Sequence, residues 1–501
     1  MTTKGGQTDA ERHILDTPAA GPAAIRGSTL RAGAYAAGIL LSLAASPLLI
    51  RHLGQAGYGR YFTVVSLIAI VAGLTEGGLN TIAVREYSTV EGPARAELMA
   101  NLFGMRLALS SAGGAVAVVF AVLAGYDRPL VLGTVVAALG MVLQLAQTML
   151  VVPLQSSLRF GWAAAIEVLR QLVSVLLIVG LVVMGATVVP FLAVPIPACL
   201  VALVATAVLV RHLTPLRPRF DLARWRPLLA DTGTYAVAIA LNALYFRVTV
   251  VIMSLISTGL QTGYFSTSFR VVEVVIGLPA LVIGSAFPIL SRAAAGDARR
   301  FGYATGRLFE IAVVVGTWIV VCIVVGSDFA VRVLGGPSAA PAAPVLRIQA
   351  LALLASFVTL ACGFPLLSLR RHRELLIANV AALCASVALT LALAPAMAAR
   401  GAAIAAVAAE ALLATITAVM LARADRSVRL PLSIFAVASV AAGCALAVGV
   451  LLHVHPIIGT ALASIVYFAV IGAFGRFPPE VRHGFGPDQW RLTLRSSPPP
   501  T

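Results

Sequence analysis

Charged residues are scarce in this chain of 501 residues: only 11% are Asp, Glu, Lys or Arg, and Lys4 is the single lysine. In a soluble domain about a quarter of all residues are charged. Between Leu30 and Phe474 no polar segment is long enough to form a separate domain, and 60% of all residues are hydrophobic. This composition excludes a soluble enzyme with a membrane tail, a secreted protein and a disordered chain.

Sequence signatures of catalysis are missing as well. The five cysteines show no CxxC spacing, the seven histidines show no HExxH spacing, and the chain has no GxxxxGK[S/T] loop. The predicted outer loops are short, whereas a membrane glycosyltransferase or polymerase usually needs a large polar loop to hold its sugar site. We therefore expect a protein that is not an enzyme, with no catalytic residue, no metal site and no cofactor.

Long apolar runs dominate what is present. They are continuous and rich in Ala and Leu, which excludes the alternating strands of an outer-membrane barrel. Since a helix needs about 20 apolar residues to cross a bilayer, the sequence predicts an all-α polytopic membrane protein with about fourteen transmembrane helices. The expected spans are residues 29–50, 60–84, 98–124, 129–152, 162–184, 187–210, 229–257, 262–290, 303–326, 345–368, 374–394, 400–422, 431–452 and 456–475.

The basic residues predict the orientation of these spans. With the N-terminus in the cytoplasm, 28 of the 36 Lys and Arg residues fall on the cytoplasmic side, Arg106 and Arg170 among them. This bias follows the positive-inside rule and places both termini in the cytoplasm. The net charge of +16 is thus an orientation signal and requires no nucleic acid. The Ala- and Arg-rich composition indicates a high-GC bacterial genome and hence the bacterial inner membrane.

A short repeat predicts two related halves. Residues 55–58 (QAGY) precede the second expected span, and residues 261–264 (QTGY) precede the eighth. Six helices separate them, so the halves would have the same orientation, as in transporters built from parallel repeats. The predicted organisation is a flexible cytoplasmic tail (1–27), a six-helix lobe (28–210), a basic linker (211–228), a second six-helix lobe (229–422), two additional helices (423–475) and a cytoplasmic tail (476–501).

Charges inside the expected spans are the strongest functional candidates, because a charge at mid-bilayer costs at least about 2.5–3.5 kcal/mol. Arg247 and Arg270 are each about 12–15 Å from the outer end of their helices. Glu273 follows Arg270 by one turn. One interpretation is a cationic cavity for phosphate or pyrophosphate, which Arg binds bidentately. The alternative is a neutralising Arg270–Glu273 pair that helps the helix to insert.

Other polar residues in the spans are weaker candidates. Glu76 precedes Gly77 and Gly78, where the helix is loosened, and with Asn80 it either lines a cavity or belongs to a small-residue packing site. Glu410 has no cationic residue within one turn of sequence, so it is either a proton-coupling acid or a neutral acid between helices. Arg31 either meets an anionic headgroup or anchors the first helix at the interface.

Three fragments resemble polysaccharide-biosynthesis exporters, or lipid-linked oligosaccharide flippases, of the multidrug/oligosaccharidyl-lipid/polysaccharide (MOP) transporter superfamily. The first is residues 51–60 (RHLGQAGYGR), with GGLN at 77–80 and Arg85 and Glu86. The second runs from residues 245–247 (YFR) through 263–264 to Pro288, and the third is residues 401–406 with Glu410. Members commonly carry an Asp shortly after the Arg of helix seven, whereas residues 247–250 read RVTV here.

The resemblance implies two six-helix lobes around a central cavity plus two C-terminal helices, working by alternating access. It implies transfer of a polyprenyl-pyrophosphate-linked saccharide to the outer leaflet, with Arg247, Arg270 and Arg31 as substrate-binding candidates. The missing Asp moves ion coupling to Glu273, Glu76 or Glu410. The lipid-linked saccharide and the bilayer are the expected partners, with a glycan polymerase or glycosyltransferases as further ones. The alternatives are a cation-coupled multidrug antiporter, a membrane glycosyltransferase and a silent scaffold of envelope assembly.

Overall fold

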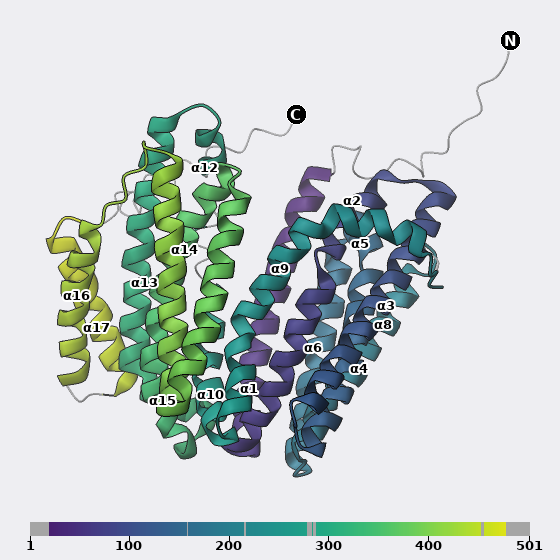
Figure 1. Ribbon diagram of the computed structural model, residues 1–501, viewed down its shortest axis with the longest axis horizontal. Coiled ribbons are helices and arrows are strands. Elements are labelled where there is room, and N and C mark those ends of the chain that lie inside the picture. Colours follow the sequence, from purple (N-terminus) through teal and green to yellow (C-terminus); the bar gives the residue numbers. More distant parts are fainter. Residues whose placement is uncertain are drawn as a thin grey trace, which may run out of the picture. The chain divides into compact units, whose positions relative to one another are not determined.

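The computed structural model describes residues 20–157, 159–214, 217–277, 283, 287–451 and 455–476, and its regular structure in these ranges is helical (Figure 1). Within them, eleven helical segments are long and apolar enough to cross a membrane. The predicted class, an α-helical polytopic membrane protein, is thereby confirmed. The number of fourteen spans and the arrangement in two six-helix lobes stay predictions.

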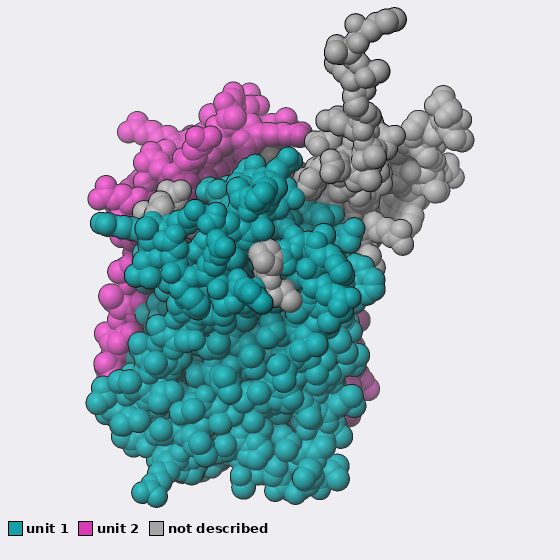
Figure 2. Space-filling model, turned by 90° about the vertical axis from the view of Figure 1, so that its right-hand side faces the viewer, with its two compact units in different colours: residues 1–266 teal, residues 267–501 magenta. Residues whose placement is uncertain are grey.

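The chain divides into two compact units, Met1–Ser266 and Thr267–Thr501, drawn in two colours in Figure 2. In the first unit, α1 packs against α6 and α9, α3 packs against α4, and α4 packs against α8. The helices of this unit are α1 (Ala20–Glu76), α2 (Leu79–Thr89), α3 (Gly92–Leu123), α4 (Arg128–Leu150), α5 (Val152–Ser156), α6 (Phe160–Val183), α7 (Val188–Ala193), α8 (Pro195–Val210), α9 (Leu222–Ile256) and the first part of α10 (Gly259–Val275).

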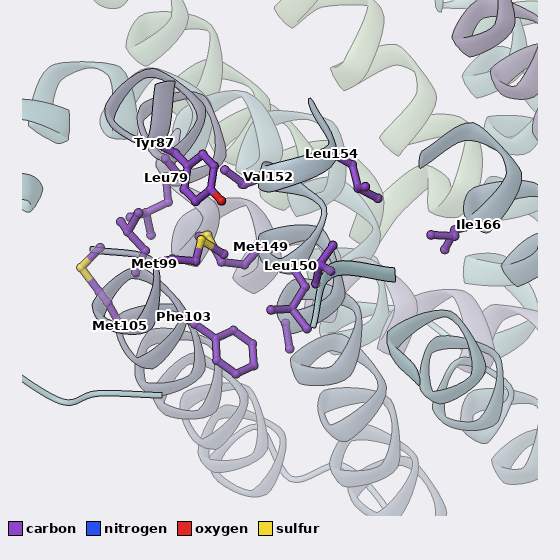
Figure 3. Close-up of a cluster of buried hydrophobic side chains, with 14 of the residues drawn as sticks. Leu79, Tyr87, Met99, Phe103, Met105, Met149, Leu150, Val152, Leu154 and Ile166 are labelled. Atoms are coloured by element: carbon purple, nitrogen blue, oxygen red, sulfur yellow. The ribbon is translucent and has the colours of Figure 1, made fainter. Parts of the chain in front are cut away.

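A cluster of buried apolar side chains holds one end of the first unit together (Figure 3). Tyr87 of α2, Met99 and Phe103 of α3 and Met149 of α4 belong to it, and Trp225 of α9 packs against it. Helices in a bilayer associate through close packing of such side chains. The cluster therefore fixes short α2 to the longer helices even though α2 is separated from α1 by a break.

Glycines interrupt α1 at one point and end it at another. Gly54 has φ 67° inside α1, so the element is two helices joined at this residue. After Glu76, Gly77 (φ 44°) and Gly78 (φ 73°) break the chain before α2 begins. Such φ values favour glycine because it lacks a Cβ atom. The expected span over residues 60–84 thus consists of two helices that are separated at these glycines, where the sequence indicated a loosened helix, and the first helix begins at Ala20, before its expected start.

The second unit is built around three long helices. α13 packs against α14, α14 packs against α15, and the hairpin of α16 and α17 packs against α13. The Trp318 indole of α13 donates to the Ser464 hydroxyl (3.0 Å), and the Tyr467 phenol donates to the Val314 carbonyl (2.9 Å). The elements are α12 (Phe287–Ala294), α13 (Ala298–Gly335), the 3₁₀ turn η3 (Pro337–Ala342), α14 (Ala343–Ser368), α15 (His372–Ala424), α16 (Ser433–Leu451) and α17 (Pro456–Ala473).

One packing detail recurs in both units. In the first unit, a Cβ atom on Gly104 of α3 would lie 2.0 Å from the Arg219 carbonyl oxygen, in the segment that follows α8. In the second unit, a Cβ atom on Gly302 of α13 would lie 2.4 Å from the Ser427 carbonyl oxygen, in the segment that follows α15. A phenylalanine precedes each glycine. In both places the absence of a side chain lets a connecting segment cross directly over a helix.

Candidate functional site

The two QxGY fragments noted in the sequence lie in contact within the first unit. A Cβ atom on Gly263 of α10 would lie 1.9 Å from the Gln55 carbonyl oxygen of α1, and one on Gly59 would lie 2.3 Å from the Gly259 carbonyl oxygen. Real Cβ atoms essentially never approach another heavy atom this closely. Glycine is thus required at both positions for the start of α10 to pack on α1. We call the contact of Gly59 with Gly259 and Gly263 the glycine contact.

Arg247 of α9 lies over Phe62 of α1, which follows Gly59 of the glycine contact by three residues, about one helical turn. Its guanidinium carbon is 5.2 Å from the centre of the Phe62 ring, and Phe62 is almost fully buried. A cation over an aromatic face gains about 0.5–2 kcal/mol, with the larger values in desolvated places. The ring therefore offsets part of the cost of a half-buried guanidinium in a membrane span. No sequence pattern singled out Phe62 for this position.

Arg270 and Glu273 form the pair that their spacing predicted. Nη1 of Arg270 is 2.7 Å from Oε2 of Glu273, on the same side of α10, and both side chains are about four-fifths buried. Arg247 belongs to the first unit and Arg270 to the second. Their assignment to one phosphate site stays a prediction.

A cavity of about 540 Å³ opens within the first unit. Residues of α1, α4, α7, α8 and α9 line it, and most of them are apolar or small. Its polar lining groups are Glu76 and Tyr61 of α1, Gln144 of α4 and Asn242 of α9. One carboxylate among neutral hydrogen-bonding groups in an apolar wall is the composition of a small-ligand or cation site.

The break after α1 brings several predicted residues together. Glu76 is the last residue of α1, with its side chain 44% exposed toward the cavity side, and Gly77 and Gly78 follow it directly. Asn80 is in the first turn of α2, and its side-chain Oδ1 is buried without a hydrogen-bond partner among the described residues. The structure therefore places this predicted group at a true helix interruption beside a cavity.

Arg106 of α3 was missed as a candidate. The sequence predicted a span that begins near residue 98, with Arg106 on the cytoplasmic side. In the structure α3 begins at Gly92, and Arg106 is fully buried. Its Nη2 is 4.0 Å from Oε1 of Glu76. The available signal was an arginine about 20 Å from the start of α3, well beyond Arg95 and Glu97 in its first turns.

The remaining candidates lie in other parts of the chain. Glu410 is buried on α15, between Ala409 and Ala411, in the second unit. Arg31 is on α1, and its side chain lies outside the described residues. Among the described residues, no group of three or more His, Cys, Asp or Glu side chains could hold a metal ion.

At the turn between α3 and α4, Tyr126 connects this end of the unit to α9. Its hydroxyl lies 2.7 Å from the Ser254 hydroxyl, and burial raises the pKa of the Tyr126 phenol. Asp127 beside it caps α4 by accepting from the Leu130 amide and pairs with Arg60 of α1 at 3.1 Å. These contacts hold α9 and α1 at the end of the unit that carries the glycine contact.

Comparison with solved structures defines the class of fold. The lipid II flippase MurJ in an inward closed conformation aligns with TM-score 0.75 and 13% identity over 89% of this chain and 99% of its own. An inward-facing multidrug resistance MATE family transporter aligns with TM-score 0.54 and 15% identity over 77% and 95%. A MOP superfamily transporter from Pyrococcus furiosus Vc1 (DSM3638) aligns with TM-score 0.53 and 16% identity over 80% and 95%.

The fold is therefore that of MOP superfamily flippases and transporters. Residues 25–294 also match the family model described as polysaccharide biosynthesis protein, which is more than half of the chain. The chain belongs to this polysaccharide biosynthesis protein family. No curated protein sequence matches it. The structural neighbours are a flippase and transporters of the superfamily that the sequence resembles, and that resemblance is confirmed.

Proposed function

We propose that this protein is a flippase that moves a polyprenyl-(pyro)phosphate-linked oligosaccharide, or a related glycan precursor, from the cytoplasmic to the outer leaflet. The family supplies the link to polysaccharide biosynthesis, and the fold is shared with a lipid II flippase. The observation that carries the proposal is Arg247, a half-buried guanidinium inside an apolar helix and held over Phe62. Such a cation favours an anionic group inside the membrane over a cationic drug.

The proposed roles follow from chemistry at membrane depth. Arg247 and Arg270 bind the pyrophosphate, since guanidinium groups match phosphate oxygens bidentately. Arg270 is seven residues after Gly263 on α10, which places both on the same face of that helix. Arg31, at the cytoplasmic start of the first expected span, contributes a further positive charge for the anionic headgroup. The saccharide occupies a central cavity while the lipid tail stays in the bilayer.

Ion coupling is proposed for the acidic candidates. Glu76 is at a cavity, Glu273 is paired with Arg270, and Glu410 is buried in α15. The cycle is alternating access between lobes 28–210 and 229–422, with fourteen spans, both termini in the cytoplasm and the bacterial inner membrane as the location. A glycan polymerase or glycosyltransferases of the same pathway are proposed partners.

The second candidate function is cation-coupled multidrug antiport. The cavity of the first unit favours it, because Glu76 there is accompanied by the aromatic side chains of Tyr61 and Phe191. An acid with aromatic neighbours suits an organic cation. The similarity of fold to MATE family transporters is consistent with it.

The test is lipid analysis after the protein is depleted in its own host. We expect one defined polyprenyl-linked saccharide to accumulate on the cytoplasmic leaflet. Expression of the wild-type chain or of Arg128→Ala should reverse the accumulation, while Arg247→Ala at equal membrane abundance should not. Arg128 is the matched control, since it is exposed at the start of α4. Altered sensitivity to cationic dyes without lipid accumulation would instead support the antiporter.

A further inference from the structure

Arg106 is the largest fully buried side chain among the described residues of the protein, and the proposed flippase cycle gives it no role. It is located well inside α3, in a segment apolar enough to span the membrane. An arginine stays protonated in proteins, so its charge must be compensated where it is buried. The groups around the guanidinium therefore indicate what it does.

Three backbone carbonyls accept hydrogen bonds from this guanidinium. Nη1 donates to the carbonyls of Thr75 (3.3 Å) and Glu76 (3.4 Å), the last two residues of α1, and Nε donates to the carbonyl of Leu145 in α4 (3.4 Å). One side chain thus connects α3 with the end of α1 and with the body of α4. All three contacts are long, so their combined geometry matters more than any one of them.

The end of α1 needs such a partner for two physical reasons. The last four carbonyls of a helix have no partner within the helix, and inside a bilayer water does not replace it. The helix dipole also concentrates negative charge at this end. Because Gly77 and Gly78 turn the chain away with positive φ, α2 cannot continue the hydrogen-bond ladder of α1. A buried cation answers both requirements.

The same guanidinium is also the charged group facing Glu76. Nη2 of Arg106 comes from α3 to 4.0 Å from Oε1 of Glu76. The other polar groups that line the cavity with Glu76 are Tyr61 on its own helix, Gln144 of α4 and Asn242 of α9. Tyr61 is the titratable one among these three, and none carries a charge at neutral pH.

We infer that Arg106 is a positioning residue that maintains the α1–α2 break and keeps the Glu76 carboxylate in place at the cavity. It acts through the α1 carbonyls and through Glu76 rather than by touching a transported molecule. The inference requires no particular substrate, so it holds or fails independently of the proposed flippase activity. It predicts two separable effects, one on helix geometry and one on the carboxylate.

The geometric effect is measured on the purified full-length protein in lipid nanodiscs, by double electron–electron resonance between spin labels at Ser88 of α2 and Val116 of α3. Both positions are exposed. We expect Arg106→Gln to shift or broaden the distance distribution, because the α1 carbonyls lose their donor. Arg106→Lys should give an intermediate distribution, since one ammonium cannot reach carbonyls on two helices together.

Arg170→Gln is the matched control for this measurement. Arg170 is also a mostly buried arginine of the first unit, and it pairs with Glu167 on its own helix α6. We expect this variant to leave the distance distribution between Ser88 and Val116 unchanged, even if it lowers thermal stability. An unchanged distribution in Arg106→Gln, or an equal change in Arg170→Gln, would overturn the geometric part of the inference.

The effect on the carboxylate is measured by the rate at which dicyclohexylcarbodiimide, a hydrophobic reagent for carboxyl groups, modifies Glu76. Mass spectrometry assigns the site, and Glu76→Gln identifies the background. We expect modification several-fold faster in Arg106→Gln, since the Glu76 carboxylate loses the guanidinium that faces it at 4.0 Å. Arg106→Lys keeps the charge and should react like wild type.

The lysine variant also covers the case in which Arg106→Gln does not fold. Arg106→Lys with a wild-type reaction rate and an altered distance distribution would support both roles. Fast Glu76 modification in Arg106→Lys, or an unaltered rate in a folded Arg106→Gln, would refute the charge role.

Discussion

At the scale of single residues, three arginines inside helices are stabilised in three different ways. Arg106 meets helix carbonyls and Glu76, Arg247 meets an aromatic face, and Arg270 meets Glu273 on its own helix. An ion pair within one helix lowers the free energy of inserting both charges into the bilayer and does not depend on which helices pack beside it. The guanidinium of Arg247 lies over the ring of Phe62, a residue of another helix, so its position depends on how α9 packs against α1.

Arg270→Lys separates substrate binding from charge balance. Lysine retains the positive charge beside Glu273 but not the planar fork that binds two phosphate oxygens. If Arg270 binds phosphate, we expect normal membrane abundance and transport reduced about tenfold or more, the size of one lost charge-assisted hydrogen bond. Transport is assayed by the cytoplasmic accumulation of the lipid-linked saccharide.

Glu273→Gln accompanies this variant as its comparison. If the pair serves only insertion, Arg270→Lys should transport like wild type and Glu273→Gln should lower membrane abundance. That pattern would remove Arg270 from the substrate site and leave Arg247 there.

At the scale of elements, glycines decide where helices end and where they touch. Gly54 joins the two halves of α1, Gly77 and Gly78 separate α1 from α2, and the glycine contact brings α10 onto α1. α15 is interrupted in the same way at Ala398, a non-glycine residue whose φ of 49° is also positive. A non-glycine residue in this region costs about 1–3 kcal/mol, which the packing of the hairpin around it must offset.

Gly263→Ala tests the glycine contact. The added methyl would overlap the Gln55 carbonyl oxygen, so α10 must move away from α1. Overpacking of this kind costs typically about 1–3 kcal/mol. We expect a lower melting temperature in detergent and faster maleimide labelling of a cysteine at Gln55, which is almost fully buried in the packed arrangement.

Gly259→Ala is the control within the same helix. A methyl group there would lie 3.6 Å from the nearest atom, the Ala56 carbonyl oxygen, at ordinary contact distance. We expect wild-type stability and slow labelling at Gln55. Equal behaviour of the two alanine variants would show that close approach at Gly263 does not hold α10 on α1.

At the scale of the whole molecule, the match to the family model is shorter than the alignment to the MurJ structure. The family model covers residues 25–294, which includes the first unit from α1 to the start of α10, whereas the MurJ alignment covers 89% of the chain. Beyond residue 294, the similarity of the second unit to known proteins therefore rests on its fold. Its terminal hairpin of α16 and α17 is nevertheless firmly attached to α13 through Trp318, Tyr467 and the Arg476–Glu310 pair.

The topology predicts the side of the membrane on which each turn is exposed. Ala56 and Leu260 are exposed neighbours of the two QxGY fragments, while Gln55 is buried. We expect cysteines at Ala56 and Leu260 to react with a membrane-impermeant maleimide from outside intact cells. A cysteine at Ser88 should react only after permeabilisation, following the positive-inside rule. Reaction of Ala56 and Leu260 from opposite sides would disprove both the topology and the repeat.

The sequence alone determined the membrane class, the family and the segments that become helices, because hydropathy and composition are local properties that a bilayer reads one helix at a time. It also made candidates of Arg247, Arg270 with Glu273, and Glu76 with its glycines, since a charge in an apolar run is visible without knowledge of its partner; their functional roles stay predictions. The Arg270–Glu273 contact was predictable because both residues share one helix.

Only the tertiary structure decided which residues meet between helices. Arg106 is fully buried because α3 begins earlier than hydropathy indicated and because the ends of α1 and α4 supply its acceptors. Phe62 under Arg247 and the glycine contact likewise join residues that are far apart in the chain. The physical reason is that a helix satisfies its backbone internally, whereas its side-chain partners depend on which helices pack together.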